Sequence, residues 1–256
     1  MSSSTIPDRA DHYFVASDGA KVHWVSAGSG VPVVLIHGAG SRAERWFANG
    51  LAPTLARTNR VIVPDMRGHG ESDAADAASF EKMPSDVIEI LDSLGVAKAH
   101  VGGYSMGGMI TARLLATHPE RFITAFFGGS GIRETPEWAE RVPPDREGAA
   151  PDEEAARAAR AAGGISEGVP ARSPEGAQRP GRPVLDIDLT TIHFPVLAVN
   201  GEYDRPYQKT HRLWRELSNF TNVVLAGKGH LSAIVEGYMP SDFESALVGF
   251  ITANNP

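Results

Sequence analysis

The sequence predicts an α/β fold, in which a mostly parallel β-sheet carries helices on both faces. Short apolar runs of strand length alternate along the chain with longer segments whose apolar residues have helical spacing. Val31–Ile36 and Arg60–Pro64 are apolar at most positions, which is typical of strands buried on both faces of a sheet. Gly131–Pro183 lacks this alternation. We therefore expect one core domain over residues 1–130 and 184–256, with a small cap or lid inserted over residues 131–183.

The expected strands follow from their apolar pattern and from the turns that bound them. The first two form a hairpin, because Asp18-Gly19 separates two alternating runs. The run after them ends at His37-Gly38, and the later runs end at similar loops rich in glycine or polar residues. The eight expected strands are His12–Ser17, Lys21–Ala27, Val31–Ile36, Arg60–Pro64, Ala99–Gly103, Ile123–Phe127, Val196–Asn200 and Asn222–Ala226.

The expected helices lie between these strands. Phe80–Leu94 shows the pattern best, because Val87, Ile90 and Leu91 have helical spacing and Gly95 is a natural C-cap. The alternation of strands and helices implies that the helices cross over from strand to strand on both faces of the sheet. The five expected helices are Phe80–Leu94, Met106–His118, Asp152–Ala162, Gln208–Leu217 and Ser241–Ile251, and Glu44–Arg57 is a further amphipathic segment.

The insertion Gly131–Pro183 has few large apolar residues and cannot form a core of its own. Asp152–Ala162 is expected to be helical by propensity, with acidic residues at its start and arginines later. We expect a lid over the carboxyl edge of the sheet that is more mobile than the core, since ordering each backbone residue costs about 1–2 kcal/mol. Trp138 and the helix are its expected docking points.

The composition narrows the class of protein. The chain has 256 residues, 42% of them hydrophobic and 21% charged, as in ordinary globular proteins. A net charge of −7 argues against nucleic acid or an anionic membrane as a partner. The absence of cysteine excludes disulfides, thiolate nucleophiles and zinc–cysteine sites. Met1–Ala10 has no apolar core typical of a signal peptide, and no apolar run approaches membrane-spanning length, so a cytoplasmic location is expected.

The most informative stretch is Gly103-Tyr104-Ser105-Met106-Gly107, between an expected strand and an expected helix. A Gly-x-Ser-x-Gly pentapeptide at such a junction is typical of a nucleophile elbow. The turn holds Ser105 in a strained backbone conformation, and the flanking glycines avoid collisions across it. The serine hydroxyl then projects beyond the sheet, near the N-terminus of the following helix. This pattern predicts a serine hydrolase with Ser105 as the nucleophile.

Two further residues complete the predicted catalytic group. Asp204 and His230 each follow an expected strand, so they should meet Ser105 at the carboxyl edge of the sheet. The chain order of nucleophile, acid and histidine is the one expected for this architecture. A serine hydroxyl is a poor nucleophile at neutral pH, so His230 must accept its proton while Asp204 fixes the imidazole tautomer.

The predicted oxyanion hole combines two backbone N–H groups. One belongs to Met106, directly after the nucleophile. The other comes from the small-residue turn His37-Gly38-Ala39-Gly40, and we assign it to Ala39. Small residues let this backbone approach a tetrahedral intermediate closely.

These motifs resemble those of the α/β-hydrolase superfamily. The resemblance covers Tyr13–Gly131 and Leu185–Thr252, and implies an eight-stranded sheet whose second strand is antiparallel. Ser105 at the elbow argues against the branches of haloalkane dehalogenases and epoxide hydrolases, which carry aspartate there. Gly131–Pro183 occupies the place of the family's cap, which usually sets substrate preference. The matching segments are His37-Gly38, Pro64–Ser72, Gly103–Gly108, Pro195–Asp204 and Gly229-His230.

Several site residues have competing interpretations. Glu134 and Asp73 are alternative acids, and so is Asp65, although we expect Asp65 to bind backbone amides. His37 and His69 are expected to brace loops.

Other side chains are candidates for substrate contact. Trp46, Tyr104 and Trp138 are the candidate substrate-binding residues, with core packing as the alternative for Trp46 and Tyr104. Arg42 and Arg45 either bind a substrate carboxylate or belong to a solvated helix face, and the solvated face is favoured.

The expected activity is hydrolysis of a small-molecule ester or lactone, with no metal or cofactor. Cleavage of a carbon–carbon bond in a β-diketone, or perhydrolysis as in the haloperoxidase-like relatives, could use the same residues. A hydrolase-fold receptor and a dinucleotide-binding protein are weaker alternatives; the latter would use Gly38–Ala43 as its phosphate loop. The oligomeric state stays open, with a homo-oligomer among the options.

Overall fold

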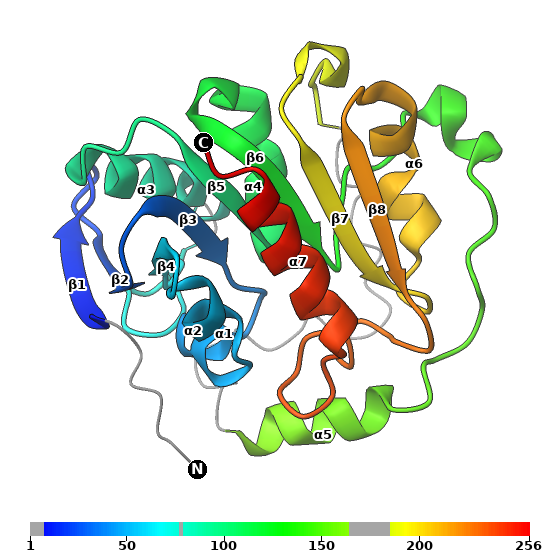
Figure 1. Cartoon of the computed structure of the whole chain (residues 1–256), viewed down its shortest axis with the longest axis horizontal. Helices are drawn as coiled ribbons and strands as arrows, with labels where there is room; N and C mark the ends of the chain where they lie inside the picture. The colour runs from blue at the N-terminus through cyan, green and yellow to red at the C-terminus, as the bar shows by residue number, and fades with distance from the viewer. Residues whose placement is uncertain (1–7, 77–78, 164–184) are drawn as a thin grey trace.

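The computed structural model describes residues 8–76, 79–163 and 185–256, and its centre is a single eight-stranded sheet (Figure 1). The spatial order is β1-β2-β4-β3-β5-β6-β7-β8. β2 is antiparallel to both of its neighbours, and the pairs from β4 to β8 are parallel. The strands are β1 (Ala10–Val15), β2 (Lys21–Ala27), β3 (Val31–Ile36), β4 (Asn59–Pro64), β5 (Ala99–Tyr104), β6 (Phe122–Gly128), β7 (Val196–Gly201) and β8 (Phe220–Leu225). The predicted fold class and antiparallel second strand are confirmed.

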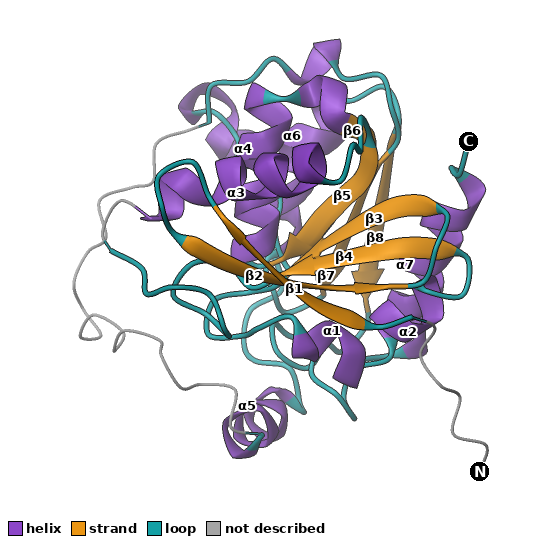
Figure 2. Cartoon of the chain, turned by 90° about the vertical axis from the view of Figure 1, so that its left-hand side faces the viewer, coloured by secondary structure: helices purple, strands orange, loops and turns teal. Residues whose placement is uncertain are grey.

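Helices cover both faces of the sheet (Figure 2). On one face α3, α4 and α6 bury the larger apolar cluster, which includes Ile90, Ile110 and Leu213. On the other face α1, α2 and α7 bury a second cluster around Trp46 and Phe243. The helices are α1 (Glu44–Ala48), α2 (Leu51–Leu55), α3 (Ser79–Ser93), α4 (Met106–Thr117), α5 (Glu153–Ala162), α6 (Pro206–Glu216) and α7 (Ser241–Ala253). None of these helices is long and apolar enough to cross a membrane.

Two expected elements differ in the structure. The amphipathic segment expected over Glu44–Arg57 forms two helices: α1 ends at Ala48 and α2 begins at Leu51, and Gly50 between them has a φ of 88° that is incompatible with a continuous helix. The first strand lies two residues earlier than expected, because Ala16 and Ala20 already belong to the hairpin turn, where the Ala16 N–H donates to the Ala20 carbonyl at 2.8 Å.

The described part of the insertion, residues 131–163, contains the short 3₁₀ helix η2 (Pro136–Arg141) and helix α5. Residues 164–183 of the expected lid lie outside the described residues. Trp138 packs between the guanidinium groups of Arg141 and Arg215, which lie 4.4 and 4.3 Å from its ring centroid. The greater mobility expected for the insertion stays a prediction.

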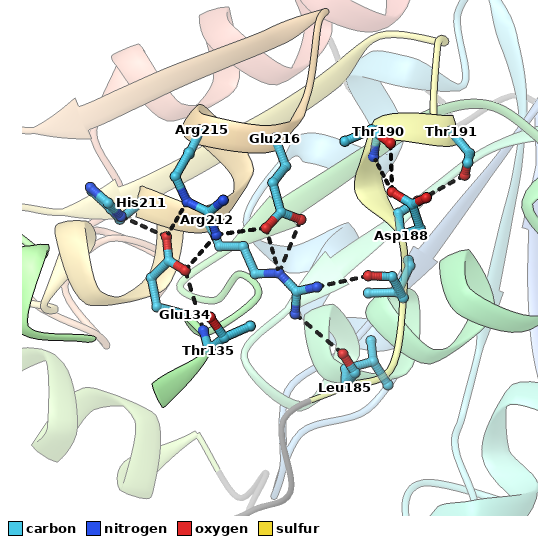
Figure 3. A network of polar contacts seen from close by, with 11 residues as sticks. Glu134, Thr135, Leu185, Asp188, Thr190, Thr191, His211, Arg212, Arg215 and Glu216 are labelled. Carbon is cyan, nitrogen blue, oxygen red and sulfur yellow. Dashed lines mark hydrogen bonds and ion pairs between the residues drawn. The ribbon is translucent and has the colours of Figure 1, made fainter. Parts of the chain in front are cut away.

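Both ends of the insertion are attached to α6 (Figure 3). On the outgoing side, the Glu134 carboxylate accepts hydrogen bonds from Arg215 at 2.9 and 3.2 Å. On the returning side, Arg212 donates to the carbonyls of Leu185 and Ile187 at 3.2 and 2.7 Å. One helix therefore sets where the insertion leaves and rejoins the core.

Candidate active site

Ser105 occupies the sharp turn between β5 and α4. Its φ of 55° and ψ of −107° are strained for a residue with a side chain, as the elbow pattern predicts. The Ser105 N–H donates to the Gly128 carbonyl at 2.8 Å, which ties the turn to β6. At Gly107, a Cβ atom would lie 2.1 Å from the Ile36 carbonyl oxygen. Glycine is therefore required there for α4 to pack against the end of β3.

The structure brings Ser105, His230 and Asp204 together in one hydrogen-bonded chain. His230 Nε2 lies 3.0 Å from Ser105 Oγ, and His230 Nδ1 lies 2.8 Å from Asp204 Oδ2. Because an ionised carboxylate only accepts hydrogen bonds, Nδ1 carries the proton and Nε2 is free to accept from the serine hydroxyl. This is the arrangement that activates a serine for nucleophilic attack.

A lysine that the sequence analysis did not identify binds the other oxygen of the acid. Lys209 Nζ, from α6, lies 2.5 Å from Asp204 Oδ1. Burial lowers the pKa of Lys209, while the neighbouring carboxylate favours the charged form. Both Asp204 oxygens are therefore occupied, and the carboxylate is held in one orientation toward His230.

The loop that carries His230 is fastened on two further sides. The Tyr104 hydroxyl donates to the His230 carbonyl at 2.6 Å. The Glu153 carboxylate of α5 accepts from the N–H groups of Leu231 and Ser232 at 2.9 and 3.0 Å. The insertion thus contributes directly to the position of the predicted catalytic histidine.

The predicted oxyanion loop, His37–Gly40, passes next to Ser105. A Cβ atom built on Gly38 would lie 3.4 Å from Ser105 Cβ, so the two backbones are in close contact. His37 Nδ1–H donates to the Gly38 carbonyl at 2.8 Å, and His37 Nε2 accepts from the Met66 N–H at 3.0 Å. Burial lowers the pKa of His37 to about 4, so its ring is neutral as these bonds require.

The hydrogen bonds of His37 determine the direction of the Ala39 N–H, which is the proposed oxyanion-hole donor. The Gly38 carbonyl and the Ala39 N–H belong to one trans peptide and point in opposite directions, so His37 orients the Ala39 N–H as well. His69 adds a second brace, because its Nε2 accepts from the Gly40 N–H at 3.1 Å. Met106 begins α4, where first-turn N–H groups have no partner within the helix.

One face of α5 reaches both loops. Glu153, Ala156 and Arg160 are spaced three and four residues apart and lie on the same side of the helix. Glu153 binds the loop after His230, Ala156 is fully buried, and Arg160 donates to the Ala39 and Gly40 carbonyls at 2.5 and 2.9 Å. The spacing of these three residues is visible in the sequence. Nothing in the sequence identified the backbone groups that Glu153 and Arg160 bind.

A cavity opens beside Ser105 and His230. Its wall includes three of the residues proposed for substrate contact, which are Trp46, Tyr104 and Arg45. Trp138, also proposed for substrate contact, is not among the lining residues; its ring contacts Arg141 of η2 and Arg215 of α6. Arg42 is exposed outside it. The lining residues are His37, Gly38, Ala39, Ser41, Arg45, Trp46, Tyr104, Ser105, Arg160, His230, Leu231, Ile234 and Val235.

The competing acids have other partners. Asp65 accepts from the Ala43 and Glu71 N–H groups at 2.6 and 3.0 Å, as expected, and also binds His23. Glu134 forms its own pair with His211, at 2.6 Å, beside Arg215 (Figure 3). Asp73 accepts from the Lys21 N–H at 2.7 Å. None of the three is bonded to His230.

Many solved structures resemble the chain over nearly its whole length. Est816, described as an enzyme that degrades N-acyl homoserine lactones, is 27% identical with a TM-score of 0.71, covering 94% of this chain and 100% of that one. A meta-cleavage product hydrolase from Pseudomonas fluorescens IP01 is 25% identical with a TM-score of 0.73, covering 95% of this chain and 98% of that one.

Curated relatives are similar over a shorter segment. (E)-2-((N-methylformamido)methylene)succinate hydrolase from Acinetobacter baylyi is 34% identical over 105 residues, which are 41% of this chain and 39% of that protein. The chain spans less than half the length of the curated relatives it matches. Residues 31–173, more than half of the chain, match the family defined by the α/β-hydrolase fold. Together with the eight-stranded sheet, this match shows that the protein belongs to the α/β-hydrolase family.

Proposed function

We propose that this protein is a serine hydrolase that cleaves a carboxylic ester or lactone of a small molecule through an acyl-enzyme. The observation that carries the proposal is the hydrogen-bonded chain from Ser105 Oγ through His230 to Asp204. The lactone-degrading enzyme among the structural neighbours supports the same class of substrate.

In the first half of the reaction, Ser105 Oγ attacks the substrate carbonyl while its proton passes to His230 Nε2. Asp204 stabilises the imidazolium that forms. The negative charge on the carbonyl oxygen is bound by the N–H groups of Ala39 and Met106, which develop their strongest hydrogen bonds in the transition state. Collapse of this intermediate breaks the bond to the leaving alkoxide, which takes the proton from His230.

In the second half, a water molecule replaces the leaving group. His230 removes a proton from the water as it attacks the acyl carbon, and then returns that proton to Ser105 Oγ. The bond between Ser105 and the acyl group breaks, and the carboxylic acid is released. The free enzyme is restored, and a lactone differs only in that its leaving hydroxyl remains attached to the acyl chain.

Cleavage of a carbon–carbon bond is the second candidate. It is favoured by the likeness to the meta-cleavage product hydrolase, at 25% identity over 95% of this chain. The same serine, histidine and oxyanion loop would serve that reaction, with a carbon leaving group in place of an alkoxide. A β-diketone and a meta-cleavage product assayed beside esters distinguish the two.

The decisive experiment compares the wild type with Ser105→Ala. A fluorophosphonate probe should label the wild type and leave Ser105→Ala unlabelled. Hydrolysis across a p-nitrophenyl ester chain-length series should fall by roughly 10³–10⁶-fold in the variant. Ser130→Ala is the matched control, because Ser130 also follows a strand but its buried hydroxyl has no hydrogen-bond partner in the described part of the chain. Equal labelling of wild type and Ser105→Ala would overturn the assignment.

A further inference from the structure

Arg45 is an unusual component of the cavity wall. It belongs to α1, is only 9% exposed and lines the cavity beside Ser105. Its Nη2 is buried and has no hydrogen-bond partner within residues 8–76, 79–163 and 185–256. The neighbouring Trp46, also in the wall and 1% exposed, has a buried indole Nε1–H without a partner in the same ranges. A buried donor left unpaired costs about 1–3 kcal/mol, so two such donors from consecutive residues of one cavity wall indicate a missing acceptor.

Most of the charged groups near Arg45 are positive, as Arg45 itself is. Burial lowers the pKa of Arg45, and the second cause is repulsion from Arg160, which lines the same cavity. Arg42 adds further repulsion, and Glu236 is the opposing charge. Glu236 is exposed and forms no ion pair with Arg45 in the described structure. Among the described residues, no carboxylate therefore forms an ion pair with the Arg45 guanidinium.

We propose that the cavity binds a substrate that carries a carboxylate in addition to the carbonyl attacked by Ser105. This inference rests on the proposed function and specifies its substrate class: half-esters of dicarboxylic acids, or esters whose alcohol part bears a carboxylate. In this proposal the Arg45 guanidinium binds the carboxylate, the Trp46 indole N–H donates to it, and Arg160 contributes long-range attraction.

A carboxylate suits this site better than a neutral polar group. Its two oxygens accept several hydrogen bonds, and they match the planar fork of donors on a guanidinium. It also supplies the charge that Arg45 lacks, which water or a ketone does not. A site built around buried donors rejects analogues that leave those donors unpaired. The expected result is a preference for charged over neutral substrates of the same shape.

The test uses pairs of ethyl esters that differ only at the far end. Monoethyl glutarate is compared with ethyl 5-oxohexanoate, in which a methyl ketone replaces the carboxylate, and the succinate and adipate pairs extend the series. A second arm compares 3-acetoxypropionate with its neutral methyl ketone analogue, to place the carboxylate on the acyl or the alcohol side. In the wild type, kcat/KM for the charged member of at least one pair should exceed that of its neutral partner by about 10–100-fold.

Two variants assign the preference to Arg45. Arg45→Met should remove most of the preference, because kcat/KM should fall much more for the charged ester than for its neutral partner. Its thermal stability should be unchanged or higher, because the substitution removes a buried charge without a protein partner. Arg42→Gln removes the same charge from an exposed neighbour on the same segment and should leave the preference intact. Loss of stability without loss of preference in Arg45→Met would overturn the inference.

A binding experiment separates this inference from the proposed function. Glutarate is titrated calorimetrically into Ser105→Ala and into the double variant with Arg45→Met. Binding that is lost with Arg45 supports the carboxylate site even if no ester is hydrolysed. Ester hydrolysis without charge preference, together with no glutarate binding, overturns the carboxylate site while leaving the hydrolase assignment standing.

Discussion

Lys209 Nζ lies 2.5 Å from Asp204 Oδ1, whereas Asp204 Oδ2 binds His230 Nδ1 at 2.8 Å. The acid of the predicted triad is thus shared between the Lys209 ammonium and the histidine that, in the proposed mechanism, accepts the proton of Ser105. The attraction that Asp204 exerts on the imidazolium is reduced by the lysine charge. Lys209 is a positioning residue, since it acts through Asp204.

Replacing Lys209 should therefore change the pH profile. In Lys209→Met, Asp204 keeps its bond to His230 but loses the competing lysine charge, so it should stabilise the imidazolium more strongly and move the acid limb of kcat/KM against pH to higher pH. We expect kcat to fall by about tenfold as the carboxylate loses its fixed orientation. Ester hydrolysis measured from pH 5 to 9 provides the test, with partial rescue in Lys209→Arg. Lys82→Met is the control, because Lys82 pairs with Asp18 at the surface. An unchanged acid limb would contradict the proposed effect of Lys209 on His230 through Asp204.

Glu153 should be needed for activity although it belongs to the insertion. Glu153→Ala leaves the N–H groups of Leu231 and Ser232 without their acceptor and loosens the loop of His230. We expect kcat to fall by roughly tenfold and the free energy of unfolding by about 1–3 kcal/mol. Steady-state kinetics and chemical denaturation measure the two effects. Glu154→Ala, at an exposed position one residue later, should change neither. Equal effects in both variants would show that the helix, and not this carboxylate, is responsible.

Two glycines in helices should respond oppositely to alanine. At Gly107 a Cβ would lie 2.1 Å from the Ile36 carbonyl oxygen, so Gly107→Ala must displace α4 or β3 and should lower the melting temperature and the activity. At Gly249, in α7, a Cβ would meet nothing within 4 Å. Gly249→Ala should raise stability by about 0.5–1 kcal/mol, the usual helical advantage of alanine. Thermal unfolding of both variants is the measurement. A stable, fully active Gly107→Ala would contradict the conclusion that the elbow has no room for a Cβ at this position.

His37 should contribute to acid sensitivity. Burial lowers the pKa of His37 from 6.5 to about 4 in the folded protein, so below pH 6.5 the unfolded chain binds a proton that the folded chain excludes. The stability that depends on neutral His37 is present above pH 6.5 and is lost as the pH falls toward 4, on the order of 3 kcal/mol in total.

Denaturant unfolding at pH 7 and pH 4.5 tests this dependence. The wild type should lose more stability than His37→Gln over the same interval. NMR of the histidine rings in the wild type gives a second, independent reading, in which His37 stays neutral at pH 5.5. A His37 ring that is protonated at that pH would contradict the buried, neutral state.

The parts of the site that the sequence predicted are those defined by local patterns. Ser105 lies within a pentapeptide whose glycines are demanded by sterics, and Asp204 and His230 follow apolar strands whose ends must meet at one edge. The contacts of Glu153 and Arg160 could not be predicted, because they join residues 78 and 121 positions apart through a helix whose docking depends on the whole fold. The amphipathic pattern over Glu44–Arg57 continues across Gly50, so it did not show that the segment divides there into two helices.

The attachment of the insertion to α6 has a consequence for how such a protein can diversify. Arg215 holds the chain where it leaves the core and Arg212 where it returns, so the gap between the two ends is fixed by one helix (Figure 3). Extra residues between fixed ends cost little, about 0.6 kcal/mol for each doubling of loop length. Segments of different length can therefore be exchanged at this place without disturbing the sheet. Any replacement must still supply a carboxylate for the histidine loop and a cation for the oxyanion loop, which makes α5 the part of the insertion least free to vary.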